Sequence, residues 1–311
     1  MEQAASLTQP GPPRASAPGL LEPVNVAPGT SLLCVDLEEW STESCADDAL
    51  FLLDLFARTR ARATFFVLGL VARREPHLVR RIAAAGHEIA SHGWDHEQVF
   101  LKTPARFRAE MARAHGTLSD LVGRPIAGYR APHFSIGPST WWALDALADL
   151  GFAYDSSVFP FAGPRYGVPG FPRGPVRIVR DGRQLLEVPL STVRAVGRNL
   201  PVAGGGYFRL LPQPLIERAV RAVHADGLPF VSYCHPYEFR REPLVYPRPP
   251  GRLGGARAAA LGAKFNFRRG TMPGKLARLL ERFPFTSCEA ALGHALPRAA
   301  RVEAPGDRPL R

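Results

Sequence analysis

Residues 64–91, TFFVLGLVARREPHLVRRIAAAGHEIAS, contain one complete strand–helix–strand unit. The run 64–70 is apolar and rich in Phe, Val and Leu, which is typical of a buried strand. Residues 76–85 have helical periodicity, start with a proline and are followed by Gly86, a residue that favours a helix C-cap. A second strand is expected over 87–91, so this unit predicts two parallel strands joined by a helix.

The same alternation continues on both sides of this unit. Further strands are expected over 31–38, 126–130, 152–156 and 230–234, and a hairpin over 176–188 turns at Asp181-Gly182. Further helices are expected over 46–60, 103–121, 139–150, 215–225 and 275–282. Strands that alternate with helices predict an α/β architecture. Six or seven such units favour a closed or nearly closed βα barrel over an open doubly wound sheet.

The chain divides into four expected regions. Residues 1–29 and 298–311 are expected to be flexible tails, and residues 30–240 form the barrel. Residues 241–297 are a C-terminal extension, which opens with a loop rich in Pro, Gly and Arg over 240–260.

Composition excludes several classes of protein. Hydrophobic residues make up 46% and charged residues 22%, as in folded soluble domains. No apolar run reaches the roughly 18–20 residues of a membrane span. Four cysteines without a C-x-x-C pair and the lack of a secretory signal predict reduced thiols and a cytoplasmic location. The net charge of +11 comes from scattered arginines without an aromatic-interleaved stripe, so a nucleic-acid partner is not expected.

Two patterns indicate a metal site. His92 and His96 are four residues apart just after a predicted strand, and two such imidazoles suit a divalent cation, although ordinary polar histidines are an equal alternative. Asp36 and Glu38 share one face at the end of the strand over 31–38. Taken alone, these two acids are better explained as the solvated end of a strand than as part of a metal site.

Three further segments place polar residues at predicted strand ends. Arg130 is suited to a bidentate pair with a carboxylate, and Asp155 and His235 are suited to be an orienting carboxylate and a proton-transferring imidazole. In βα barrels the active site lies at the carboxyl ends of the strands. Polar residues at five such ends together indicate an active site, although each one alone has an unremarkable explanation.

These five segments resemble the motifs of the polysaccharide deacetylase family, carbohydrate esterase family 4, which carries the NodB homology domain. The resemblance runs from about residue 31 to residue 239 and rests on VDLEEW, SHGWDH, YRAPHFS, YDSSVFP and CHPYEF. The sequence around these motifs is similar to that of the subgroup found with exosortase-type exopolysaccharide systems. Residues 264–287 also resemble that subgroup's C-terminal extension. The resemblance implies a deformed (β/α)7 barrel that holds one divalent metal, with Zn expected and Co, Mg, Mn or Ni possible.

The resemblance also implies roles for individual residues. His92 and His96 would be metal ligands, together with an acidic ligand that is Glu38 by the strand-face argument or Glu39 by alignment with the subgroup. The implied catalytic residues are Asp36 as general base, His235 as general acid, Arg130 holding the base and Asp155 tuning the acid. The implied oxyanion and substrate contacts are a backbone N–H at or beside His133, together with Phe134 and Trp94. Trp141 and Phe159 also fit either a sugar-stacking wall or the core.

The activity implied by this pattern is metal-assisted hydrolysis of an N-acetyl group on a hexosamine-containing polysaccharide or oligosaccharide. An N-acetylated glycan is then the expected partner, and exopolysaccharide biosynthesis the expected context. Two alternatives stay open: hydrolysis of another linear or cyclic amide in the same fold, and a glycan-binding homologue without turnover.

Overall fold

The molecule is built on a curved sheet. A computed structural model describes residues 18–39, 44–163, 166–246 and 254–297. The sheet contains a series of seven strands linked by parallel pairing: β2 (Ser31–Leu37), β3 (Thr64–Val67), β4 (Glu88–Ser91), β5 (Gly128–Tyr129), β6 (Tyr154–Asp155), β8 (Arg183–Glu187) and β11 (Phe230–Cys234). The expected α/β architecture with a deformed βα barrel is therefore confirmed.

The ladder of strands runs in the order β1-β7-β8-β6-β5-β4-β3-β2-β11 and does not close within the described ranges. Its two ends still approach each other, because Ser191, just after β8, bonds to Val231 in β11. The Ser191 N–H donates to the Val231 carbonyl (3.2 Å), and the Ser191 hydroxyl accepts from the Val231 N–H (2.7 Å). The barrel is open between β8 and β11 and bridged at one point.

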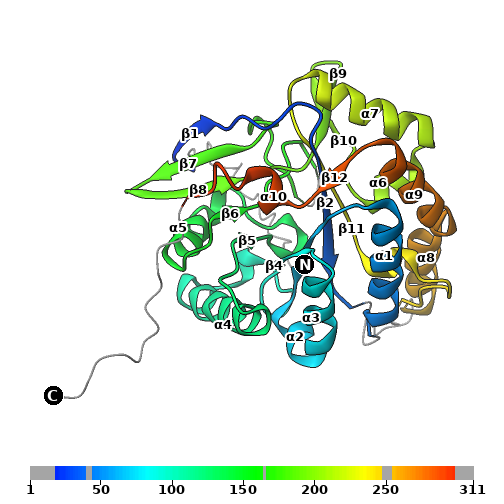
Figure 1. Cartoon of the computed structure of the whole chain (residues 1–311), viewed down its shortest axis with the longest axis horizontal. Helices are drawn as coiled ribbons and strands as arrows, with labels where there is room; N and C mark the ends of the chain where they lie inside the picture. The colour runs from blue at the N-terminus through cyan, green and yellow to red at the C-terminus, as the bar shows by residue number, and fades with distance from the viewer. Residues whose placement is uncertain (1–17, 40–43, 164–165, 247–253, 298–311) are drawn as a thin grey trace, which may run out of the picture.

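Ten α-helices are assigned in the described residues, and several of them surround the sheet (Figure 1). They are α1 (Ala46–Thr59), α2 (Gly69–Arg74), α3 (Pro76–Ala84), α4 (Pro104–Val122), α5 (Trp142–Asp149), α6 (Gly205–Leu210), α7 (Gln213–Ala225), α8 (Gly254–Asn266), α9 (Met272–Arg282) and α10 (Cys288–Leu292). The remaining strands are β1 (Leu20–Pro23), β7 (Val176–Arg180), β9 (Thr192–Ala195), β10 (Arg198–Pro201) and β12 (Phe285–Thr286).

Alternate residues of β2 enter two different cores. Leu33, Val35 and Leu37 pack into the outer core with the helices, whereas Leu32 and Cys34 pack into an inner core within the barrel. Both faces are buried, which explains why the strand reads as a continuous apolar run. Asp36 continues the inner series, so the strand carries its carboxylate toward the inside of the barrel.

Two regional expectations were wrong in part. Residues 1–29 were expected to be a flexible tail, but β1 pairs with the exposed edge of the β7–β8 hairpin. Residues 240–260 were expected to be a loop, but α8 begins at Gly254 because the stretch GGARAAALGAKFN contains five alanines and one leucine, strong helix formers. Residues 1–17 and the tail 298–311 lie outside the described residues.

No helix in the described part of the chain is both long and apolar enough to cross a bilayer.

Candidate active site

The carboxyl ends of three strands meet around one cluster of side chains. Strand β2 leads into Asp36 and Glu38, β4 into the loop with His92 and His96, and β11 into His235. Glu38 Oε2 lies 3.9 Å from His92 Nε2 and in contact with His96 Nε2, and Glu38 Oε1 lies 3.3 Å from His235 Nε2. The three imidazoles therefore surround one carboxylate.

Glu38, His92 and His96 form a group suited to holding a cation. One potential ligand atom from each lies within 4.8 Å of the others. Glu38 Oε2 is buried and faces imidazole nitrogens of both His92 and His96, so the three potential ligand atoms point toward one another. Glu39, in contrast, pairs with Arg74 at the surface. Of the two acidic candidates, Glu38 is the one that lies beside the histidines.

The protonation states also suit metal binding, which requires deprotonated ligands. Burial would raise the pKa of the Glu38 carboxyl, but the surrounding imidazoles, His235 foremost, outweigh it and lower this pKa to about 2. Burial lowers the pKa of His92 to about 4. The Nδ1 of His92 lies 2.8 Å from the Arg130 carbonyl, which only accepts, so Nδ1 carries the proton and Nε2 has a free lone pair.

Arg130 and Asp36 form a buried ion pair beside this cluster. Arg130 Nη1 donates to Asp36 Oδ1 at 2.7 Å, and the two side chains are 0% and 3% exposed. The guanidinium also donates to the carbonyl and hydroxyl of Ser156, at 3.0 and 2.9 Å, and lies 4.1 Å above the Phe66 ring. These contacts hold the Asp36 carboxylate in place.

His235 is held on several sides. The Tyr237 ring stacks on the imidazole with centroids 4.8 Å apart, and the Tyr233 ring contacts it edge-on. Its Nδ1 lies 3.6 Å from Glu238 Oε2. Burial would lower the pKa of His235, but the Glu38 and Glu238 carboxylates outweigh it and raise this pKa to about 9. His235 is therefore suited to donate a proton at neutral pH.

Two sequence-predicted residues have contacts other than those expected. Asp155 accepts from the Ser157 hydroxyl, and its pKa is raised by burial. Because β6 and β8 are parallel neighbours in register, Asp155 is paired with Glu187, and the carboxylate beside the His235 ring nitrogen is that of Glu238. Trp94 is 7% exposed and packs on Gly69 and under the Arg113 guanidinium, and its role as a substrate contact stays a prediction.

His133 and Phe134 lie at the rim of the cluster. The exposed His133 ring is 4.6 Å from the His96 ring, whereas Phe134 is buried against Tyr233. His96, His133 and Phe134 all have positive φ angles, of 63°, 56° and 52°. Non-glycine residues in this region are uncommon and strained, and they gather at functional sites. Trp141 and Phe159 belong to the core rather than to a sugar wall.

Sequence reasoning missed Glu238 and Glu187. Glu238 follows His235 by three residues in the short helix η4 (Pro236–Phe239), and its carboxylate accepts from the His235 backbone N–H at 3.1 Å. This i, i+3 spacing was a usable signal in the motif CHPYEF. Glu187, whose carboxylate accepts from the Val158 N–H, had no such signal, because its partners come from another strand.

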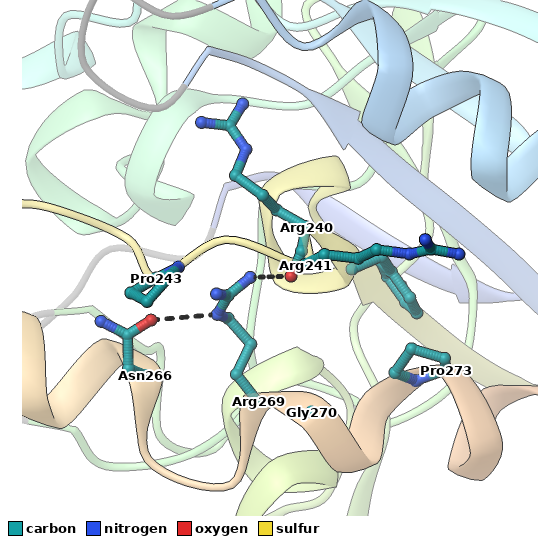
Figure 2. Close-up of a pocket in the computed structure, with 8 residues that line it drawn as sticks. Arg240, Arg241, Pro243, Asn266, Arg269, Gly270 and Pro273 are labelled. Carbon is teal, nitrogen blue, oxygen red and sulfur yellow. Dashed lines mark hydrogen bonds between the residues drawn. The ribbon is translucent and has the colours of Figure 1, made fainter.

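A cavity of about 390 Å³ lies beside the end of η4 (Figure 2). Its lining residue Arg269 donates to Asn266 Oδ1 at 3.2 Å and to the carbonyls of Tyr237, Arg240 and Glu242. These bonds hold the chain that follows η4. The cavity is lined by Phe239, Arg240, Arg241, Pro243, Asn266, Arg269, Gly270 and Pro273, none of which belongs to the His and Glu cluster.

Comparisons with known proteins identify a family for this chain. The polysaccharide deacetylase family matches residues 45–154, and a domain of unknown function (DUF3473) matches residues 156–293. A chitooligosaccharide deacetylase of Sinorhizobium fredii is 33% identical over 193 residues, which are 52% of this chain and 82% of the relative. A chitooligosaccharide deacetylase of a Bradyrhizobium strain is 29% identical over 209 residues, covering 61% of this chain and 92% of the relative.

The fold is also found among solved structures. A protein from Mycobacterium smegmatis classed as a polysaccharide deacetylase superposes with a TM-score of 0.56 at 20% identity, covering 91% of this chain and 98% of that one. From the sequence matches together, this chain belongs to the polysaccharide deacetylase family, carbohydrate esterase family 4, and is a hydrolase of carbon–nitrogen bonds other than peptide bonds.

Proposed function

We propose that this protein removes N-acetyl groups from a hexosamine-containing glycan by metal-dependent hydrolysis. The observation that carries the proposal is that Glu38, His92 and His96 converge between a held carboxylate, Asp36, and a cationic imidazole, His235. The similarity to two chitooligosaccharide deacetylases supports an N-acetylated glycan as substrate.

The residues present fit a divalent cation. Two imidazole nitrogens and one carboxylate oxygen make a donor set found in catalytic zinc sites, and here the three atoms lie within 4.8 Å of one another. When bound, such a cation would polarise the acyl oxygen and make a water molecule more acidic. Zn is the expected ion, with Co, Mg, Mn or Ni as alternatives that metal analysis distinguishes.

The chain's own residues would carry the proton transfers. Asp36, fixed by Arg130, would accept a proton from the attacking water while the water oxygen bonds to the amide carbon. His235 would donate its proton to the amide nitrogen, so that the carbon–nitrogen bond breaks to give acetate and a free amine. A backbone N–H at or beside His133 is the proposed donor to the acyl oxygen.

An acetate-release assay on N-acetyl chito-oligosaccharides, with protein loaded with each metal in turn, tests the substrate and the reaction. We expect acetate and a free amine in equal amounts. Opening of a cyclic amide without acetate release would favour a different amide substrate. Glycan binding without turnover in excess Zn²⁺, Co²⁺ or Mg²⁺ would favour a binding protein and end the proposal.

Elemental analysis of variants tests the metal site. His92→Ala and Glu38→Gln are expected to lose stoichiometric metal, because each removes one of three ligands. Glu39→Gln is the matched control and is expected to keep it, because Glu39 pairs with Arg74. Metal retained in Glu38→Gln and lost in Glu39→Gln would exchange the two assignments.

The biological context is proposed more broadly. Exopolysaccharide biosynthesis and a cytoplasmic location both remain predictions from the sequence. Deletion of the gene followed by analysis of free amines in the secreted polysaccharide tests the first, and cell fractionation tests the second.

A further inference from the structure

The Glu238 carboxylate contacts both the backbone and the ring of His235. Its Oε2 accepts from the His235 N–H at 3.1 Å and lies 3.6 Å from Nδ1 of the same residue. Nδ1 is buried and makes no hydrogen bond within 3.5 Å among the described residues, so the Glu238 carboxylate at 3.6 Å is the acidic group that faces it. Because Nε2 on the opposite side of the ring faces Glu38, the imidazole spans the gap between the two carboxylates.

A pair of glycines makes room for Glu238. A Cβ added to Gly205, the first residue of α6, would lie 1.7–2.1 Å from the carboxylate atoms of Glu238. A Cβ added to Gly204 would lie 2.4 Å from the ring of Tyr233, and Gly204 has a φ of 136°, which side-chain-bearing residues rarely adopt. The sequence at 204–206 therefore allows the start of α6 to lie directly against the His235 side of the site.

We infer that Glu238 is a positioning residue for His235, and that Gly205 is the packing partner that keeps its carboxylate in place. With Nδ1 held toward Glu238, the ring presents Nε2 to the centre of the Glu38, His92 and His96 cluster. This inference rests on the proposed function for the identity of the reaction, but the contact between the two side chains is independent of the substrate.

The obvious alternative is that Glu238 only neutralises Arg209. Arg209 Nε lies 3.8 Å from Glu238 Oε1 and has no hydrogen-bond partner among the described residues. An ion pair of that kind stabilises the fold without affecting His235 in particular. The experiment must therefore separate a general loss of fold stability from a loss of catalytic activity that acts through the His235 imidazole.

Two variants disturb the contact between the Glu238 carboxylate and His235 in different ways. Glu238→Gln keeps the side-chain length and an acceptor for the backbone N–H but removes the charge, whereas Gly205→Ala keeps Glu238 and pushes its carboxylate away. Gly206→Ala is the matched control in the same helix, since its Cβ would meet no atom nearer than Arg209 Nη2 at 4.0 Å.

We expect kcat for acetate release to fall about 10–100-fold in Glu238→Gln and Gly205→Ala, with KM and metal content unchanged, as is usual when a supporting partner of a site residue is lost. Gly206→Ala is expected to match the wild type. In a His235→Ala background, Glu238→Gln is expected to have no further effect on kcat, because two residues that act as a unit are not additive. An equal loss of kcat in that background would overturn the inference.

A spectroscopic measurement tests the contact without activity. In protein labelled with ¹⁵N-histidine, with and without Zn²⁺, we expect a low-field proton resonance on His235 Nδ1. It should disappear in Glu238→Gln and Gly205→Ala and persist in Gly206→Ala. If this pattern holds but the wild type releases no acetate, the proposed substrate fails and the positioning role stands. If acetate is released and the resonance is absent or unchanged in both variants, the positioning role fails alone.

Discussion

Asp36 is the proposed general base, and replacing one of its carboxylate oxygens with an amide group tests this role. Its Oδ1 accepts from Arg130 at 2.7 Å in a fully buried pair. Asp36→Asn keeps an oxygen that can accept from Arg130 but loses the capacity to take a proton at neutral pH. We expect turnover to fall by about 10²–10⁴-fold, the usual contribution of a general base, with metal content unchanged.

Elemental analysis and initial rates on the same preparation check this expectation. The variant also leaves the Arg130 charge buried without its partner, so a lower melting temperature is expected alongside the lost rate. A variant with wild-type turnover would remove Asp36 from the role of base.

His87 should make the protein sensitive to mild acid. Burial lowers its pKa from 6.5 to about 4, while its Nδ1 accepts from the Ala63 N–H at 3.2 Å. Between these two pH values the unfolded chain binds more protons than the folded one, so the free energy of unfolding falls as the pH drops from 6.5 toward 4. Above pH 6.5 this contribution is constant.

Urea unfolding at pH 7.5 and pH 5 measures this effect. His87→Gln keeps an acceptor for the Ala63 N–H but does not titrate, so we expect a smaller decrease in midpoint between the two pH values than in the wild type. An identical decrease in both proteins would assign the acid sensitivity to other groups.

At the residue scale, the sequence predicted which side chains gather but not all of their neighbours. Asp36, Glu38, His92, Arg130 and His235 lie at the carboxyl ends of four strands. Parallel strands end at a common edge, so their convergence was predictable. The surroundings of Asp155 were not, because they depend on β8 lying beside β6 with β7 outside it. A hairpin read from sequence does not say which of its strands joins the sheet.

At the element scale, the loop that follows β4 is held by a buried lysine. Lys102, whose side chain is 3% exposed, donates to Asp95 at 2.7 Å and also to Glu110 in α4. Asp95 lies between His92 and His96 in sequence, so this network ties the loop with both histidines to a long helix.

Lys102→Met should therefore loosen the metal site from a distance. It removes the buried one of the two cations that Asp95 and Glu110 share. We expect metal affinity to fall about 10–100-fold, the range found when supporting contacts of ligands are lost. Arg106→Met is the control. The Arg106 side chain contacts the same carboxylates but is 46% exposed, so its replacement should change the metal affinity little. Competition with a chelator gives both affinities, and equal values in the two variants would contradict this account.

Elements with strong periodicity were predictable, and those defined by distant partners were not. The expected helix over 103–121 is α4, which begins after the Thr103 N-cap and ends at Gly123 with a φ of 71°. The strand β12 has only two residues and exists because it pairs with the start of β2, more than two hundred residues earlier. A two-residue strand carries no periodicity, so only the folded structure reveals it.

At the scale of the whole molecule, the C-terminal region packs against the barrel strands rather than forming a separate unit after them. Strand β12 lies beside β2 (Figure 1), and the Cys288 and Glu289 N–H groups donate to Thr64 and to the buried Glu88 carboxylate, at 2.8 and 2.9 Å. The two family matches meet near residue 155, but His92 and Arg130 in one match and His235 in the other surround the same site. Both matched regions are therefore needed for one site.

A chain that ends at Tyr246 should consequently fail to fold stably, although it keeps every proposed site residue. It loses the buried side chains of Leu276, Leu279, Phe285 and Leu292, each of which contributes about 1.5–3 kcal/mol. Their sum, about 6–12 kcal/mol, is comparable with the whole stability of about 5–15 kcal/mol expected of a folded protein. The expected extension over 241–297 would then be part of one cooperative unit with the barrel.

Calorimetry of the full chain and the truncated chain tests this prediction. We expect one unfolding transition for the full chain, and for the truncated chain either insolubility or no cooperative transition, since the inner core would lose Cys288 and Leu292 and the Glu88 carboxylate would lose a donor. A truncated chain that melts cooperatively and binds one metal ion would show that the barrel is an independent domain. In that case β12 is an addition to a sheet that folds without it, and the role of the C-terminal region must be sought at the surface instead.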